Sequence, residues 1–332
     1  GAIGRLLDWL ELDEQNTPLC VQALTTLDAL ATGHKANASK MVGEGATAVI
    51  LKILRRARSL LERDEATLEA ATHLLATIVE VHTPAAIAIA ATDGAVSALT
   101  GLLAHENVAR TICHLSTSAE MQASIARGGG IPPLVACLGS ESTVSVCVKS
   151  NLVAAVERLS QISECRVALV KACAVGQLAM LLQSTGEEAT RVHCINSLLH
   201  LATGDTNGPA IAVARRLVTV LDAAEGASAT SHAVKALGIL SARAVQVRMA
   251  ILQAKAVPPL VRLLGDGKGV IQLPHTAGQL PAHAASVLAD LSRAEESLEE
   301  VFVSGGIFPL VSMLTSESTS VHTSAATILL QL

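Results

Sequence analysis

A short phrase that ends one helix and opens the next recurs along the whole chain. Its clearest copy is GGGIPPLVACL at 128–138, where glycines end a helix, prolines begin another and an apolar run follows. Proline fits the first turn of a helix because the N–H that it lacks would have no intrahelical partner there. Recurrence of such a phrase indicates an array of repeats rather than one compact domain.

Each copy also carries a pair of apolar residues four positions apart, which places both on one face of a helix. Consecutive pairs lie 35 to 50 residues apart, and a longer helical segment and then a shorter apolar one follow each pair. We therefore expect about eight three-helix units in a single continuous array over 1–332, without any β-strand. The units start near residues 1, 45, 94, 129, 174, 213, 255 and 305. The first members of the pairs are Leu6, Ile50, Leu99, Leu134, Leu178, Leu217, Leu260 and Leu310.

The central copy of this phrase resembles a known family. GGIPPLV at 129–135, followed downstream by a Val-x-x-Leu-Ser segment that ends at Ser160, is similar to the armadillo repeat. The likeness covers nearly the whole chain. It implies an all-α, right-handed superhelical armadillo-repeat solenoid in which the third helix of each unit lines a concave groove. Related solenoids such as HEAT arrays are the alternative.

At the groove positions, the chain differs from the armadillo pattern. Peptide-binding armadillo proteins carry an asparagine at one position of the third helix, and nuclear-import adaptors carry a tryptophan four residues earlier. Neither residue occurs at the equivalent sites of this chain, which argues against a role in nuclear import. The resemblance therefore implies the fold without the peptide-clamping ladder of importin-alpha or beta-catenin. The asparagine-equivalent sites hold Ala29, Thr77, His114, Arg158, His200, Ile239, Asp290 and Gln331.

The third helices nevertheless carry a polar face. The asparagine-equivalent site and the residues four and seven positions before it share one side of a helix. In successive units this side offers hydrogen bonds to an extended or helical segment of a partner protein, although a merely solvated face is the alternative. Arginine is enriched among binding hot spots, so we expect more from Arg158 than from the exposed Arg55 and Arg56. The predicted partner-binding residues are Asn107, Arg110, His114, Asn151, Arg158, His193, Asn196, His200, His232, Lys235, His283 and Asp290.

Charge and composition argue against nucleic acid or a membrane interior as the partner. The formal net charge is −5 and aromatic residues make up 1% of the chain. Single-stranded nucleic acids bind to aromatic side chains that stack on bases, and phosphates attract a positive surface. The mean hydropathy is +0.48. However, no apolar run approaches the roughly 20 residues of a spanning helix, so we expect no integral membrane segment.

We also expect no catalytic residue, cofactor, metal site or small-molecule substrate. The GDGKG segment at 265–269 lacks the spacing and the preceding strand of a phosphate-binding loop. His193, Cys194 and His200 are of types that bind zinc, but zinc needs three or four ligands converging within about 2.0–2.3 Å. No compact cluster of that kind is evident. Neither the Gly-x-Ser-x-Gly elbow nor the His-Glu-x-x-His helix of hydrolases occurs.

Three further segments belong to the predicted surface. The insertion GDGKGVIQLPHTAGQLP at 265–281 is rich in Gly and Pro and is expected to be a loop. A basic cluster near a helix end and an acidic segment are each expected to be a solvated face. The basic residues are Lys52, Arg55, Arg56, Arg58 and Arg63, and the acidic ones are Glu295, Glu296, Glu299 and Glu300.

The cysteines indicate the compartment. Seven cysteines occur without any Cys-x-x-Cys pair. This pattern is typical of small buried hydrophobic residues in a reducing compartment. We expect the cytoplasm, with the nucleus as the alternative.

The chain begins at a second helix and ends within a third, without the polar capping units that solenoids need. We therefore expect it to be an excerpt of a longer protein. The leading hypothesis is a non-catalytic interaction scaffold or adaptor. The family resemblance implies two alternatives. One is the substrate-recruiting segment of a larger regulator such as a U-box-type ubiquitin ligase, and the other is a lipid-anchored adaptor.

Overall fold

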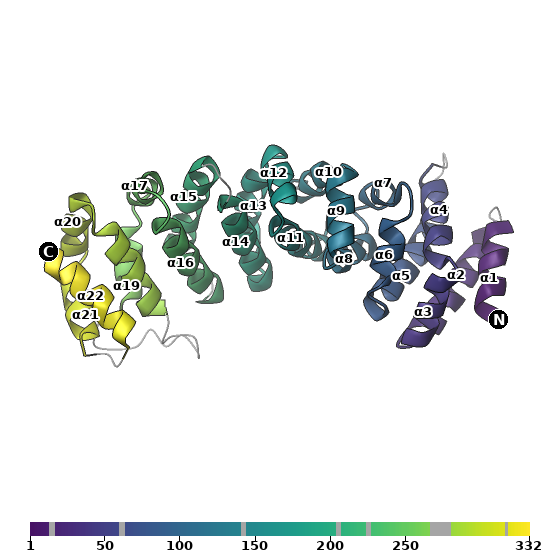
Figure 1. Ribbon diagram of the computed structural model, residues 1–332, viewed down its shortest axis with the longest axis horizontal. Coiled ribbons are helices and arrows are strands. Elements are labelled where there is room, and N and C mark those ends of the chain that lie inside the picture. Colours follow the sequence, from purple (N-terminus) through teal and green to yellow (C-terminus); the bar gives the residue numbers. More distant parts are fainter. Residues whose placement is uncertain are drawn as a thin grey trace. The chain divides into compact units, whose positions relative to one another are not determined.

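The computed structural model is built from α-helices (Figure 1). It describes residues 1–12, 17–59, 64–140, 144–203, 207–223, 227–265, 280–315 and 318–332. These residues form 22 α-helices, and none of them lies in a β-strand. The prediction of an all-α fold is therefore confirmed, whereas most of the predicted loop at 265–281 lies outside the described residues. The chain divides into two compact units, Gly1–Ala174 and Val175–Leu332, called here the N-terminal and C-terminal units.

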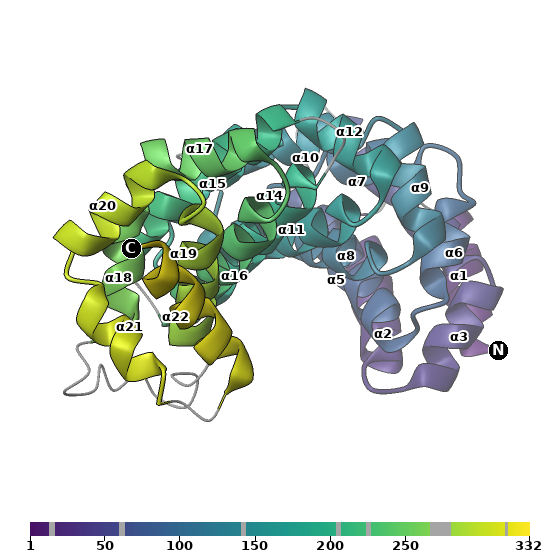
Figure 2. The same cartoon turned by 60° about the vertical axis from the view of Figure 1, so that its left-hand side comes forward.

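In the N-terminal unit, two shorter helices precede each of three longer ones, and a single helix precedes the longer helix nearest the N-terminus, in the order that the sequence predicts. The longer helices α2, α5, α8 and α11 pack against one another in order and form one row (Figure 2). These are the predicted third helices. The helices of this unit are α1 (Ala2–Leu12), α2 (Thr17–Ala31), α3 (Lys35–Gly43), α4 (Ala46–Ser59), α5 (Glu65–Val81), α6 (Ala85–Ala90), α7 (Ala95–Thr100), α8 (Glu106–Leu115), α9 (Ala119–Arg127), α10 (Ile131–Leu138), α11 (Val146–Ser160) and α12 (Ser163–Lys171).

The C-terminal unit has a second row of third helices. Here α14, α16, α19 and α22 pack against one another in order. The helices of this unit are α13 (Ala174–Ser184), α14 (Glu188–Ala202), α15 (Asn207–Ala223), α16 (Ala227–Ser241), α17 (Val245–Gln253), α18 (Val257–Leu263), α19 (Leu280–Leu291), α20 (Glu295–Val303), α21 (Ile307–Met313) and α22 (Thr319–Gln331).

A residue in the left-handed backbone conformation separates the first helix of a repeat from the second. At Gly129, between α9 and α10, φ is +70°, and the next residue's N–H bonds back to the carbonyl of Ile125 at 2.9 Å. This bond closes the end of α9 in the manner of a Schellman motif, which favours glycine because a side chain is strained there. Equivalent junctions have positive φ at Gly45, Gly94, Cys173, Lys255 and Gly305.

The predicted order of helices departs from the structure at one place. A break is expected near residue 213, but α15 runs as a single helix from Asn207 to Ala223. Gly208 and Pro209 lie in its first turn, and neither glycine nor proline follows them before its end. Without a residue suited to positive φ, the first and second helices of this repeat join into one.

The core consists of the apolar residues that the repeat predicts. Both members of every predicted leucine or isoleucine pair are buried except at the two extreme copies. There Leu6 is half-buried, and Leu314 is 39% exposed. Ala and Val fill the spaces between these residues, which lets neighbouring helices approach closely. The repeated phrase thus identifies the residues that hold each repeat together.

The cysteines are only partly as predicted. All seven are free, and Cys20, Cys113, Cys165 and Cys194 are buried. Cys137 is half-buried, whereas Cys147 and Cys173 are exposed, so the prediction of buried side chains is wrong for these two. Cys147 lies in the first turn of α11, and Cys173 occupies a left-handed junction.

No single helix of the described residues is long and apolar enough to cross a membrane. The bent pair Ser163–Lys171 and Ala174–Leu182 passes the same test of length and composition only when the two are taken together.

Candidate partner-binding face

The structure places every predicted partner-binding residue on a third helix. In the N-terminal unit three of them lie on α8 and two on α11, and in the C-terminal unit the others lie on α14, α16 and α19. All are half-buried except Lys235, which is exposed. Each unit therefore has a polar face along its row of third helices, which we call its third-helix face.

The periodicity of α8 shows why these side chains point away from the core. Val108, Ile112 and Leu115 are buried on one side of the helix. Asn107 and His114 lie seven positions apart on the other side, and Arg110 lies between them. The apolar stripe thus anchors the helix and leaves its polar stripe at the surface.

Arg158 links two neighbouring third helices. Its Nη1 donates a hydrogen bond to the carbonyl oxygen of Cys113 and lies 2.9 Å from the Sγ of that residue. Cys113 is near the end of α8, where carbonyl groups lack intrahelical donors. The guanidinium therefore uses part of its donor capacity to join α11 to α8. The sequence alone predicts Arg158 as the main partner contact and does not reveal this contact within the protein.

Arg110 has an unsatisfied buried donor on this face. Its Nη2 donates to the Oδ1 of Asn107 at 3.3 Å. Its Nε is buried and has no hydrogen-bond acceptor among the described residues. A buried donor without an acceptor costs about 1–3 kcal/mol, so an acceptor brought by a ligand would be favoured here.

His114 lies in a charged neighbourhood made by three helices. Burial lowers its pKa below the ordinary value, Glu80 of α5 partly offsets this effect, and the charges of Arg158 and Arg110 lower the pKa further. The imidazole is therefore neutral at neutral pH and can both donate and accept a hydrogen bond. We call Glu80, Arg110, His114 and Arg158 the central cluster.

In the C-terminal unit, polar side chains also join neighbouring third helices. The hydroxyl of Ser241 on α16 donates to Asp290 Oδ2 on α19 at 3.0 Å, and Asp290 also lies 3.7 Å from Arg293 Nη2. In the next pair, Ser292 donates to Gln331 Oε1 at 2.6 Å. Asp290 is thus, like Arg158, engaged within the protein.

The sequence interpretation missed a hollow between α2 and α5. It has a volume of about 370 Å³, and Asp28 Oδ1 lies 3.0 Å from His73 Nδ1 at its wall. This contact is a hydrogen bond when Nδ1 carries the proton. Ala66 and Ala70 are four positions apart and leave the space open, which is the signal that could have revealed it. The lining residues are Val21, Thr25, Asp28, Ala66, Glu69, Ala70 and His73.

No group of three or more His, Cys, Asp or Glu side chains in the described part of the chain could hold a metal ion. His193, Cys194 and His200 are all described, and they form no such group. The GDGKG segment at 265–269, which is not expected to bind phosphate, lies outside the described residues except for Gly265.

Comparison with known proteins identifies the fold. The sequence matches no protein-family model and no curated protein. The structure matches an engineered protein with a TM-score of 0.71 at 22% identity, covering 100% of this chain and 78% of that one. It also matches a structure from a study of a phosphorylation switch that controls the interaction between cadherin and beta-catenin. That match has a TM-score of 0.70 at 17% identity and covers 99% of this chain and 65% of that one.

A third match names the repeat. It is a computationally designed armadillo-repeat protein for modular peptide recognition, with a TM-score of 0.56 at 21% identity. The match covers 75% of this chain and 99% of the designed one. The chain therefore has an armadillo-like helical solenoid fold, as the repeated phrase predicts.

Proposed function

We propose that this chain is a non-catalytic protein-binding scaffold that holds a segment of a partner protein on its third-helix face. The fold supports this role, because one structural neighbour is a designed protein for peptide recognition. Another comes from a study of the interaction between cadherin and beta-catenin. The residues of the third-helix face indicate the chemistry of the partner segment.

The unsatisfied donor of Arg110 is the single observation on which this proposal rests. Its buried Nε lacks an acceptor in the described part of the chain, while Asn107 beside it and Asn151 on the next third helix present half-buried amides. Arginine is over-represented among residues that dominate protein interfaces. A backbone carbonyl or a carboxylate of a partner would supply the missing acceptor. The central cluster has two arginines and one carboxylate, so it favours an acidic side chain.

The spacing of the helices favours an extended or helical segment over a small molecule. Packed helices lie about 8–10 Å apart, so side chains on successive third helices form a ladder. A ladder offers one or two hydrogen bonds per helix over a long distance, which suits a polypeptide. We propose no catalytic role, no cofactor and no nucleic-acid partner for this face.

The decisive experiment compares two arginines on neighbouring helices. A partner is first captured from native lysate, and its binding segment is then prepared and measured with purified protein. Arg110→Glu should weaken binding about tenfold or more, because it removes a donor and adds a repelling charge. Arg127→Glu is the matched control, because Arg127 is exposed on α9 and its Nε donates to the carbonyl oxygen of Ala123 in the same helix. Equal affinities for the two variants would refute the assignment of this face.

We also propose a reducing compartment, the cytoplasm or the nucleus, as the location. The support is that all seven cysteines are free thiols, two of them exposed. Fractionation of cells that express the full-length protein tests this point.

A further inference from the structure

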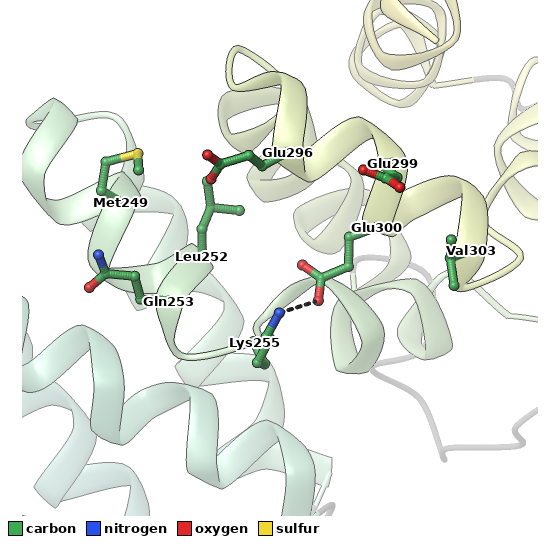
Figure 3. A pocket seen from close by; sticks show the side chains of 8 residues that line it. All are labelled: Met249, Leu252, Gln253, Lys255, Glu296, Glu299, Glu300 and Val303. Atoms are coloured by element: carbon green, nitrogen blue, oxygen red, sulfur yellow. Dashed lines mark ion pairs between the residues drawn. The ribbon is translucent and has the colours of Figure 1, made fainter.

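A second candidate surface lies in the C-terminal unit, on helices that do not belong to the third-helix face. A cleft of about 670 Å³ separates α17 from α20, which are the first helices of neighbouring repeats (Figure 3). Its size is within the range of about 300–1,000 Å³ that ligand pockets occupy. Its lining residues are Met249, Leu252, Gln253, Lys255, Glu296, Glu299, Glu300 and Val303.

Apolar side chains form part of the lining of the cleft. Leu252 is buried at 7% exposure, and Met249 is half-buried one turn earlier on the same helix. Opposite them, Val303 at the end of α20 is 75% exposed. A flexible methionine beside an exposed apolar residue is suited to receive an apolar side chain from outside.

The wall of the cleft is acidic and only partly neutralised. Glu296, Glu299 and Glu300 project from α20 (Figure 3). Among the described residues that line the cleft, Lys255 is the only cation, and its Nζ lies 3.5 Å from Glu300. Glu296 and Glu299 are exposed, and no ion pair joins either to a described residue. An excess of negative charge therefore faces the cavity.

The stability of α20 accounts for Glu296 but not for Glu299 and Glu300. Glu295 and Glu296 lie in its first turn, where negative charge is favourable, but Glu299 and Glu300 lie nearer its C-terminus, where it is not. Glu296 and Glu300 are also four positions apart, so they repel each other across one turn. A cationic ligand would relieve this repulsion. A metal ion does not fit, because no group of three ligands in the described part of the chain converges.

We propose that this cleft is a second protein-docking site and that its occupant is a short basic amphipathic segment of a partner protein. An apolar side chain of that segment enters between Met249, Leu252 and Val303. Lysine or arginine side chains that flank it meet Glu296 and Glu299. This surface is independent of the third-helix face, so either assignment can fail while the other holds.

The test uses two fluorescently labelled synthetic peptides. One is a short amphipathic helix of Leu and Lys, and the other has Glu in place of every Lys. Binding to the purified full chain is followed by fluorescence anisotropy at about 0.15 M ionic strength, and the basic peptide should bind while the acidic one should not. Equal binding of the two peptides, or tighter binding of the acidic one, would overturn the proposal.

Charge reversal locates the binding on the chain. The double change Glu296→Lys, Glu299→Lys should weaken binding of the basic peptide on the order of tenfold, because it turns two attractions into repulsions. The matched control is Glu295→Lys with Glu11→Lys, which changes the net charge equally at exposed carboxylates outside the cleft. If the control weakens binding as much as the double change, the peptide senses only net charge and the site is refuted.

A second pair of variants tests the apolar part of the lining. Met249→Gln keeps the length of the side chain and removes its apolar character, and it should weaken binding several-fold. Val245→Gln is the control, because Val245 is 59% exposed one turn earlier on α17 and does not line the cleft. Circular dichroism establishes that each variant is folded. Equal effects of these two changes would show that the peptide does not enter the cleft.

Discussion

The central cluster and the α17–α20 cleft carry opposite charge, although both lie between helices of the same kind of repeat. In the central cluster, Arg110 and Arg158 outnumber the carboxylate of Glu80, and the two arginines and His114 are half-buried. In the cleft, carboxylates outnumber the one lysine, and Glu296 and Glu299 are exposed. The repeat fixes where helices lie, while residues outside its apolar pattern determine the charge of each surface.

This difference indicates two modes of binding. A buried donor such as Arg110 Nε gains most from a precisely placed acceptor, because the cost of its burial is already incurred. Water and salt screen the interactions of exposed carboxylates. Such carboxylates therefore select a partner by its net positive charge, and their attraction for it weakens as the salt concentration rises. Raising the ionic strength should therefore weaken peptide binding at the cleft more than partner binding at the central cluster.

The largest expected effect concerns stability. Arg158→Met should lower the free energy of unfolding by about 1–3 kcal/mol, because it removes the bridge from α11 to the carbonyl oxygen of Cys113. Arg127→Met should change it by less than about 0.5 kcal/mol, since Arg127 is exposed and its Nε donates to a carbonyl oxygen of its own helix α9. Urea denaturation followed by circular dichroism measures both. Similar losses for the two variants would show that the bridge contributes little.

The second largest effect is expected from replacing Lys255, which combines a strained backbone with a charge in the cleft. Lys255 has φ of +63°, which costs a non-glycine residue roughly 1–2 kcal/mol, and it is also the cation of the cleft. Lys255→Gly should raise the free energy of unfolding by about 1 kcal/mol and tighten binding of the basic peptide several-fold.

Cys173→Gly separates these two consequences. Cys173 has φ of +62° at an equivalent junction and does not line the cleft. It should give the gain in stability without any change in peptide binding. Tighter binding in Cys173→Gly as well would mean that stability, and not the charge of the cleft, controls the affinity.

A dependence of stability on pH is expected from the central cluster. The pKa of His114 in the folded chain is below its ordinary value, so the unfolded state binds more protons as the pH falls below about 6.5. The stabilisation is therefore present above that pH and is lost as the pH falls toward the folded pKa. His114→Gln should flatten the fall of the urea midpoint between about pH 7 and 5. The opposite slope in the wild-type protein would contradict the burial of a neutral imidazole.

The apolar periodicity of the sequence predicts the third helices and nearly all of the core. Ile50, Leu134 and Leu260 are completely buried, and the residues predicted for the third-helix face lie on third helices. This success has a physical reason, because a helix in a solenoid buries one stripe and the stripe is visible in the spacing. The same spacing fails at α15, where two expected helices join because no residue interrupts them.

Contacts between helices could not be predicted in the same way. That Arg158 reaches Cys113, or that Arg55 Nη2 donates to the carbonyl of Asp93 at 2.5 Å, depends on how neighbouring repeats approach. The interpretation of Glu296 and its neighbours as a merely solvated face likewise considers α20 alone. Only the structure shows that α17 lies across a cavity from those carboxylates.

The smallest expected effect distinguishes a binding role of these carboxylates from a structural one. Glu299→Gln removes a negative charge from the C-terminal half of α20, so it should raise the free energy of unfolding by a few tenths of a kcal/mol. Glu295→Gln, in the first turn, should lower it by a similar amount. Thermal unfolding of both variants at low ionic strength measures the difference. If Glu299→Gln instead destabilises the chain, the carboxylate serves the fold, and the argument that a cationic partner accounts for it loses its support.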